Sequence, residues 1–335
     1  MPELRRDPIV NRWVIIATER AKRPPIDVAQ PISVRAGICP FCPGQESKTP
    51  REVLAYRPSD GAGARANAPG WNLRVFPNRF PALMIEGDLD RQGDGLYDRM
   101  NGLGAHEVMV ETADHSRSLA ELSSLEVEAV LCAYRDRILD LSRDTRFRYV
   151  MVFKNHGAAA GATIQHSHSQ LIALPVVPKT VSDELHGALE YHRFKERCVF
   201  CDILRQEQKD RSRLVYENGE FVVFEPYAPK FPFETWIMPR RHRAAYEDSA
   251  RHELTALSDA LRVTLHKLNR ALDNPAYNFM LHNSPLGSGS LPHYHWHMVI
   301  MPTLAPVAGF EWGSGFYINP TPPEEAAHYL REVDL

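Results

Sequence analysis

The chain carries the same order of chemistry-bearing residues twice, at an offset of 127 residues from His115 to His242. Each of these histidines follows a strand-like segment and precedes a long amphipathic one. The alternating histidines His166 and His168 recur as His293 and His295 at the same offset. Because several features keep one spacing, the sequence predicts two copies of a single folding unit.

Each copy is expected to form strands, then one long helix, then two further strands that carry the alternating histidines. Apolar residues recur at helical spacing over 119–141 and again over 254–272. In the first copy this spacing predicts a helix of roughly 22 residues, started by a capping box of Ser118 and Glu121. Strands that flank one helix in this order favour α+β architecture with mostly antiparallel sheet.

Length and composition agree with this organisation. A chain of 335 residues allows about two domains, which we expect at residues 1–178 and 179–335, each an antiparallel sheet with a long helix. The formal net charge of −3 gives no basic excess for nucleic acid. No apolar run reaches the ~18 residues that cross a bilayer. No apolar segment follows the N-terminal residues, so the expected compartment is the cytoplasm.

Four of the five cysteines stand in two C-x-x-C pairs, and each pair has two matching histidines. In a cytosolic chain such pairs indicate metal ligation or redox chemistry before structural disulfides. The two histidines are 51 residues apart in both sets, which favours two Cys2His2 zinc sites over redox pairs or buried thiols. Four protein ligands leave no open position, so both sites would be structural; iron stays open at the second. The sets are Cys39, Cys42, His115 and His166, and Cys198, Cys201, His242 and His293.

A loop of small residues, 155–163, stands directly before His166, His168 and Gln170. Gly157 permits close approach of the backbone, whose free N–H groups could hold a phosphate. Alternate residues of a strand share one face, so His168 would lie beside the ligand His166 and attack phosphorus as a neutral imidazole. Gln170 could then donate to a phosphoryl oxygen. A second pair of metal ligands, or a merely polar strand, is the alternative interpretation.

Taken together, these motifs resemble the galactose-1-phosphate uridylyltransferases, a family of the histidine-triad superfamily. The resemblance extends over nearly the whole chain, and the family fold is a pair of histidine-triad-like repeats. The matching segments are Arg5-Arg6-Asp7-Pro8, Arg20-Ala21-Lys22-Arg23-Pro24, Cys39-Pro40-Phe41-Cys42, Phe76-Pro77-Asn78, Asp114-His115-Ser116, Asn155-x-Gly157 and His166-x-His168-x-Gln170.

The resemblance implies a ping-pong transfer of UMP from UDP-glucose to galactose 1-phosphate through a uridylyl adduct on His168. Gln170 stands where hydrolases of the superfamily carry histidine. Because a sugar phosphate leaves without needing a proton, this glutamine favours transfer over hydrolysis. The resemblance also implies a homodimer. Substrate-binding roles carried over in this way fall on Arg20, Arg23, Phe76, Asn78, Asn155, Gly161 and Thr163, and on Glu311 at the sugar.

Several features differ from the familiar uridylyltransferases. Gln165 and Ser167 stand where those enzymes carry proline. The second C-x-x-C pair and the segment 309–319 resemble a sister branch, typified by plant ADP-glucose phosphorylase, that transfers AMP. Several uridylyltransferases build the second metal site from one glutamate and three histidines, for which this chain offers Glu184, His282, His295 and His297.

The predicted function is therefore a nucleotidyltransferase that moves UMP from UDP-glucose to galactose 1-phosphate. Transfer of AMP by an ADP-glucose phosphorylase-like enzyme is the alternative. A non-catalytic nucleotide-binding protein held together by zinc is a second alternative. The complete H-x-H-x-Q motif behind a small-residue loop favours an enzyme. Neither nucleic acid nor a membrane is an expected partner.

Overall fold

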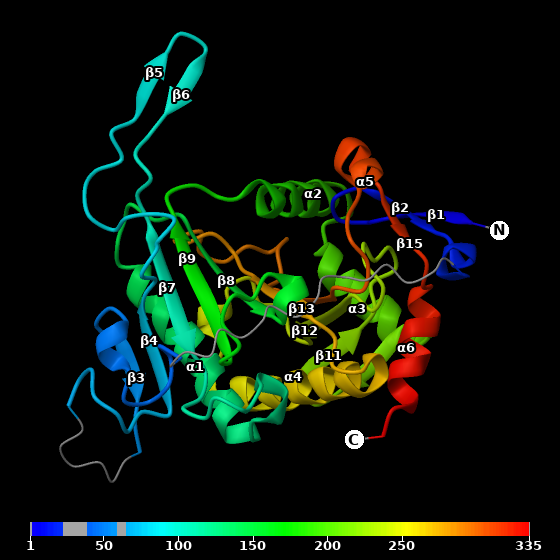
Figure 1. Cartoon of the computed structure of the whole chain (residues 1–335). Coiled ribbons are helices and arrows are strands. Elements are labelled where there is room, and N and C mark those ends of the chain that lie inside the picture. Colours follow the sequence, from blue (N-terminus) through cyan, green and yellow to red (C-terminus); the bar gives the residue numbers. More distant parts are fainter. Residues whose placement is uncertain (1, 23–38, 59–64, 335) are drawn as a thin grey trace.

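The structure is a computed structural model that describes residues 2–22, 39–58 and 65–334. Its dominant feature is one ten-stranded sheet (Figure 1). Neighbouring strands in it pair antiparallel throughout. In spatial order the strands are β10 (Leu214–Glu217), β11 (Phe221–Phe224), β12 (Thr235–Pro239), β14 (His297–Pro302), β13 (Tyr277–His282), β8 (Tyr149–His156), β9 (His168–Leu174), β7 (Ala105–Val110), β4 (Leu73–Pro77) and β3 (Leu54–Tyr56).

The two halves of the chain meet in the middle of this sheet, where β8 pairs antiparallel with β13. Phe153 lies opposite Met280 in that register, and these two residues are 127 positions apart. The two copies are thus related by a local two-fold axis that passes between these residues. The predicted division between residues 178 and 179 falls between β9 and α2 (Lys179–Lys195).

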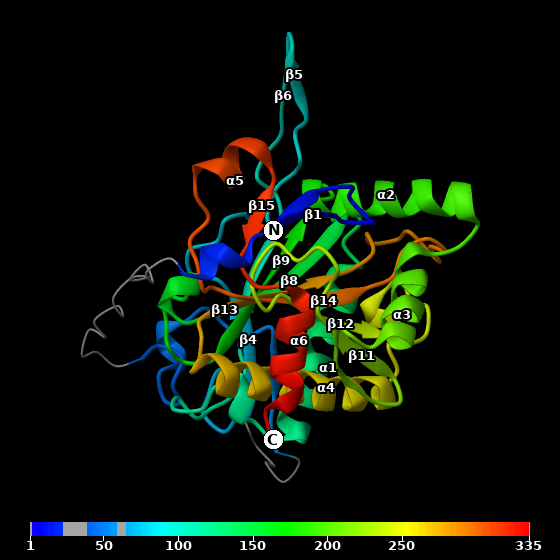
Figure 2. The ribbon, with the colours of Figure 1, turned by 90° about the vertical axis from the view of Figure 1, so that its right-hand side faces the viewer.

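One face of the sheet is covered by the two long helices, α1 (Ser124–Leu141) and α4 (Arg251–Leu272), which pack against each other (Figures 1 and 2). Their apolar sides and alternate residues of the central strands form one continuous core. Leu171 and Ala173 of β9 belong to it. The intervening residues of β9 therefore point to the opposite face, and His168 and Gln170 are among them.

The first long helix begins later than the sequence predicts. Ser118 donates its backbone N–H and its hydroxyl to the Glu121 carboxylate, but this box closes only a 3₁₀ turn over Leu119–Glu121. A second capping box, between Ser123 and Glu126, starts α1. Two successive boxes thus compete for the same amphipathic segment, and the second starts the α-helix, which has 18 residues.

The opposite face of the second half is covered by α2 and α3 (Val199–Asp210), which pack on β11, β12 and β14. Near them lies a small sheet of β1 (Glu3–Arg6), β2 (Trp13–Ile16) and β15 (Tyr317–Asn319). The hairpin β5 (Gln92–Asp94)–β6 (Tyr97–Arg99) stands out from the body (Figure 2). The remaining elements are α5 (Gly309–Ser314), α6 (Pro323–Glu332) and the 3₁₀ turns η1 (Thr18–Lys22), η2 (Glu46–Lys48), η3 (Leu119–Glu121), η4 (Ala158–Ala160) and η5 (Tyr246–Asp248).

The predicted fold class is confirmed: helices and antiparallel sheet form an α+β protein with two similar units, each with one long helix. Among the described residues, no helix is both long and apolar enough to cross a membrane.

Candidate active site

The first predicted metal set comes together at one end of β9. Cys39, Cys42, His115 and His166 each place one ligand atom within 4.8 Å of the others. The Cys42 thiol lies 3.4 Å from Nδ1 of His115 and 3.6 Å from Nδ1 of His166. Nε2 of His166 lies 2.8 Å from the carbonyl oxygen of Thr112. Nε2 therefore carries the proton and Nδ1 presents its lone pair to the thiols.

The second metal set differs from the prediction by one residue. Cys198, Cys201 and His242 come together as expected, but the fourth member is His295, not His293. The Cys201 sulfur lies 3.4 Å from Nδ1 of His242 and 3.7 Å from Nδ1 of His295. His293 contributes only its carbonyl oxygen, which accepts from the Cys198 thiol at 3.5 Å.

The chain explains why a single offset misplaced this ligand. The segment between the two ligand histidines is two residues longer in the second half. The long helix of that half also has 22 residues, against 18 in the first. Beyond the helix His295 therefore takes the place of His166, and His297 the place of His168. In both pairs Nδ1 of the second histidine faces the carbonyl oxygen of the first, at 2.8 and 3.1 Å.

Cys201 has the character of a metal-binding thiolate. Its pKa is lowered to about 3, because the Cys198 thiol donates to its sulfur and because His242 and His295 add hydrogen bonds that outweigh the cost of burial. A thiolate next to two imidazoles is a donor set that zinc prefers.

A third buried cluster contains Glu184, His282 and His297. Oε2 of Glu184 lies 2.9 Å from Nδ1 of His282, and the His282 ring stacks on that of His297 at 4.8 Å. These are three members of the alternative glutamate–histidine set. The fourth, His295, faces Cys201 instead.

His168 is held in one orientation at the start of β9. Its Nδ1 lies 2.8 Å from the carbonyl oxygen of His166, so Nδ1 carries the proton and Nε2 keeps a free lone pair. The Phe41 ring packs edge-on at 5.3 Å. Burial lowers the pKa of His168, and the nearby Lys154 ammonium lowers it further. The imidazole is therefore neutral at pH 7, as a nucleophile requires.

Gln170 is oriented by His106, a residue to which the sequence analysis gave no role in the site. The backbone N–H of Ala82 donates to Nδ1 of His106 at 3.1 Å, so Nε2 carries the proton. Nε2 then donates to Oε1 of Gln170 at 2.8 Å. With its oxygen held in this way, Gln170 presents its amide N–H groups as donors. The only signal in the sequence was a polar residue that alternates with valines along β7.

The small-residue loop is fixed by a side chain from the other half. Asn278 of β13 donates through Nδ2 to Oδ1 of Asn155 at 2.8 Å and to the carbonyl oxygen of Ala160 at 2.9 Å. The Asn155 amide N–H groups are thereby turned away from Asn278. Gly157 has φ of +79°, and a Cβ there would lie 2.8 Å from that of Ala276, so no other residue fits. Gly161 also has a positive φ, of +88°.

A buried ion pair supports His168 from the helix side of the sheet. Nζ of Lys154 lies 2.6 Å from Oε2 of Glu111 and also donates to the carbonyl oxygen of His168 at 2.9 Å. Ser167 donates its hydroxyl to the same carboxylate oxygen at 2.7 Å. Burial alone raises the pKa of Glu111, but the Lys154 ammonium and the hydroxyl outweigh it and hold the pKa below its ordinary value. The sequence gave no sign of this pair.

The other predicted substrate-binding residues are distributed unevenly. Phe76 lies in the site, with its ring 5.6 Å from that of Phe41, and Asn78 packs beside His106. Thr163 is exposed on the loop before β9. Glu311 lies on α5, where it accepts from the backbone N–H of Ala308. Arg20 is exposed on η1, and Arg23 lies outside the described residues.

Comparison with known proteins gives matches over the whole chain. The model of the galactose-1-phosphate uridyl transferase N-terminal domain matches residues 1–178, and that of a domain of unknown function, DUF4921, matches residues 103–332. The chain is 38% identical to the ADP-glucose phosphorylase of Arabidopsis thaliana, over 100% of this chain and 93% of the relative. It is 28% identical to the galactose-1-phosphate uridylyltransferase of Thermotoga maritima, over 100% and 99%.

Solved structures show the same similarity. The crystal structure of the Arabidopsis thaliana ADP-glucose phosphorylase with bound ADP-glucose matches with a TM-score of 0.86 and 37% identity, over 100% of this chain and 99% of that chain. A uridylyltransferase structure matches with a TM-score of 0.77 and 27% identity, over 99% and 97%.

The Lys154–Glu111 pair gives a testable expectation. Lys154→Met leaves a buried carboxylate without its partner and should lower the free energy of unfolding by about 3–5 kcal/mol. Because the pKa of Glu111 is lowered in the fold, the pair stabilises the protein above the ordinary glutamate pKa, and this contribution is lost as the pH falls through the folded-state pKa. Urea unfolding at neutral and acidic pH measures both effects.

Lys179→Met is the matched control, since Lys179 forms an exposed pair with Asp183 and should cost less than about 1 kcal/mol. Adding Glu111→Met to Lys154→Met should recover much of the loss, because it removes the stranded charge. Equal losses in the single variant and its control would contradict the importance of the pair.

Proposed function

The chain belongs to the galactose-1-phosphate uridylyltransferase family, and from this premise we propose that it transfers a nucleotide through a covalent adduct on His168. The observation that carries the proposal is the fixed tautomer of this histidine. Nδ1 is occupied by the His166 carbonyl, and the lone pair of Nε2 stays free on a neutral ring. A neutral, rigidly held imidazole beside a phosphate-sized loop is suited to attack on phosphorus.

In the first step Nε2 of His168 attacks the α-phosphorus of a nucleotide sugar. A P–N bond forms, the P–O bond to the β-phosphate breaks, and the sugar 1-phosphate leaves with the bonding electrons. In the second step an acceptor phosphate oxygen attacks the same phosphorus, and the P–N bond breaks. The leaving groups are anionic at neutral pH, so no general acid is needed.

Residues around His168 would stabilise the charge that develops on the phosphoryl oxygens. Gln170 and Asn155 both have their amide oxygens engaged, by His106 and Asn278, and so present N–H groups. Donors aimed in advance at a developing charge lower the barrier without reorganisation. Gly161 lets backbone N–H groups approach, and Phe76 and Asn78 would line the nucleoside site. Arg20 and Arg23 would neutralise phosphate charge.

ADP-glucose is the donor that we propose first, with inorganic phosphate as acceptor. Supporting this choice are the 38% identity to an ADP-glucose phosphorylase and the second Cys2His2 cluster, the feature that resembled that branch in the sequence. UDP-glucose with galactose 1-phosphate is the second candidate, supported by the match of residues 1–178 and by the 28% identical uridylyltransferase. Glu311 would accept sugar hydroxyls, and a homodimer stays a prediction.

Zinc fits both Cys2His2 clusters. At each, Nδ1 of a histidine faces the thiols while its Nε2–H donates to a backbone carbonyl, that of Thr112 for His166 and that of Leu291 for His242. Such carbonyl partners fix the orientation of ligand imidazoles. Zinc bound there would tie the C-x-x-C turns to the sheet, and four protein ligands would leave no position for substrate.

The covalent step predicts an adduct of defined mass. Protein incubated with ADP-glucose and no acceptor, quenched at alkaline pH, should gain the mass of one AMP in an intact-mass measurement. UDP-glucose tested in parallel should give one UMP if the second candidate holds. His168→Ala should abolish the adduct, because it removes the nucleophile.

His186→Ala is the control, since His186 is exposed on α2 and should leave the adduct unchanged. An adduct that persists in His168→Ala would contradict the proposed nucleophile. Tight nucleotide binding without an adduct from either donor would favour the non-catalytic alternative.

His106 gives a prediction for the orientation of Gln170. His106→Phe frees the amide to rotate and should slow adduct formation about tenfold, or ~1.4 kcal/mol, as measured by quenched-flow mass spectrometry. Gln170→Leu should slow it at least as much. The double variant should be no slower than Gln170→Leu, because His106 acts only through that side chain. Additive losses would contradict this coupling.

The metal clusters give a separate prediction. Cys42→Ser and Cys201→Ser should each lose about one zinc per chain by elemental analysis of the purified protein. Cys132→Ser is the matched control, because Cys132 lies on α1 outside both clusters, and should lose none. Unchanged zinc in either first variant, or iron in place of zinc, would contradict the assignment.

A further inference from the structure

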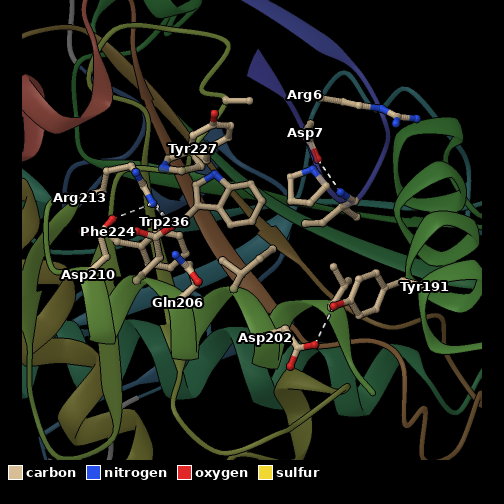
Figure 3. A pocket seen from close by; sticks show the side chains of 17 residues that line it. Arg6, Asp7, Tyr191, Asp202, Gln206, Asp210, Arg213, Phe224, Tyr227 and Trp236 are labelled. Atoms are coloured by element: carbon tan, nitrogen blue, oxygen red, sulfur yellow. Dashed lines mark hydrogen bonds and ion pairs between the residues drawn. The ribbon is translucent and has the colours of Figure 1, made fainter. Parts of the chain in front are cut away.

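The second half contains a pocket of about 500 Å³ that the proposed transfer reaction does not use (Figure 3). It lies between the first turn of the chain, at Pro8 and Ile9, and helix α3. Phe224, Tyr227 and Trp236 line it with aromatic rings. A volume of this size is typical of sites for small organic ligands.

The register of the sheet shows where this pocket stands in the repeat. Phe76 pairs with Val108 in the first half, and Phe224 pairs with Trp236 in the second. Val108 lies opposite Gln170, and Trp236 lies opposite Val299, so the two pairs occupy equivalent positions. Phe224 thus takes the place of Phe76, which the proposed function assigns to the nucleoside.

The second half has the walls of a nucleoside site without the means of transfer. Trp236 stacks on the His297 ring at 4.7 Å, and His297 is fully buried. His168, its counterpart, is 7% exposed, with the smaller Val108 in place of the tryptophan. Val299 replaces Gln170, so no amide is available there. A ligand in this pocket would be bound but not attacked.

One polar atom in the pocket has no partner. Glu207 is 3% exposed, and its Oε1 accepts from Nε and Nη2 of Arg213 at 3.2 and 2.9 Å. Its Oε2 is buried and has no hydrogen-bond partner within the described part of the chain. A buried acceptor without a donor is costly, and an N–H group of a ligand would satisfy it.

The charges around the pocket exclude phosphate. Asp7, Asp202 and Asp210 join Glu207 in its lining, where Arg6 and Arg213 are the two arginines. Arg213 is already paired with Glu207 and with Glu324. The excess of carboxylates repels anions and attracts neutral or cationic groups that donate hydrogen bonds.

We propose that this pocket binds a nucleoside without phosphate, its base between the aromatic rings and one of its N–H groups on Oε2 of Glu207. The comparison with the Phe76 site rests on the proposed function, whereas the volume, the rings and the unpartnered carboxylate do not. Ligand binding would hold the first turn of the chain against α3, because Ile9 and Ile203 face each other across the pocket's lining.

The test is a calorimetric titration of the full-length protein with adenosine and with guanosine, after the first site is saturated with AMP. We expect one further equivalent of at least one nucleoside per chain. Glu207→Gln keeps an oxygen for Arg213 but turns an N–H group toward the ligand, and should weaken binding at least tenfold. Ile203→Trp should fill the pocket and abolish binding.

Glu190→Gln, an equivalent change at an exposed position of α2, is the control and should leave binding unchanged. Nucleoside binding that is unaffected by Glu207→Gln, absence of a further equivalent, or AMP binding there as tightly as adenosine would each overturn the proposal. If Ile203→Trp does not fold, Glu207→Gln still decides the matter. The AMP or UMP adduct on His168, measured on the same samples, should be unchanged in Glu207→Gln, so failure of the pocket and failure of the transfer reaction are distinguishable.

Discussion

The antiparallel pairing of β8 with β13 is the constraint on which the rest of the structure depends. It joins two copies of one unit edge to edge, so the strand that would be exposed in each half is covered by the other. It also makes the candidate active site a product of both copies. Asn278, from the second half, holds Asn155 and Ala160 of the first, and the phosphate-sized loop takes its shape from that contact.

Below this seam the two copies use one frame for different purposes. In each, a Cys2His2 cluster holds the first of two alternating histidines, and the carbonyl of that residue fixes the tautomer of the next. What differs is the residue on the neighbouring strand. Val108 leaves space over His168, whereas Trp236 covers His297. A single aromatic side chain is therefore enough to separate a reactive imidazole from a structural one.

How much of this was predictable follows from the kind of signal each feature leaves. Patterns that repeat within one copy, such as the C-x-x-C pairs and the long helices, were visible in the sequence and were confirmed by the structure. His293 was wrong as a ligand because a constant offset ignores the two extra residues before His295. The start of α1 was misjudged because two capping boxes stand five residues apart. His106 and Lys154 left no signal, because their partners lie on strands that are distant in sequence.

The retained pocket in the second half bears on why the copies diverged as they did. In a duplicated unit, the residues that shape the sheet and the Cys2His2 clusters are needed in both copies, because each half supports the edge of the other. The residues that act on phosphate are needed only once. The change from Val108 to Trp236 and from Gln170 to Val299 removes chemistry from the second copy without disturbing its strands, since all four positions lie within paired β-structure. The same substitutions leave the aromatic wall at Phe224 intact. The carboxylates of α3 then decide what that wall admits, and Glu207, fixed by Arg213 through one oxygen, leaves the other for a ligand.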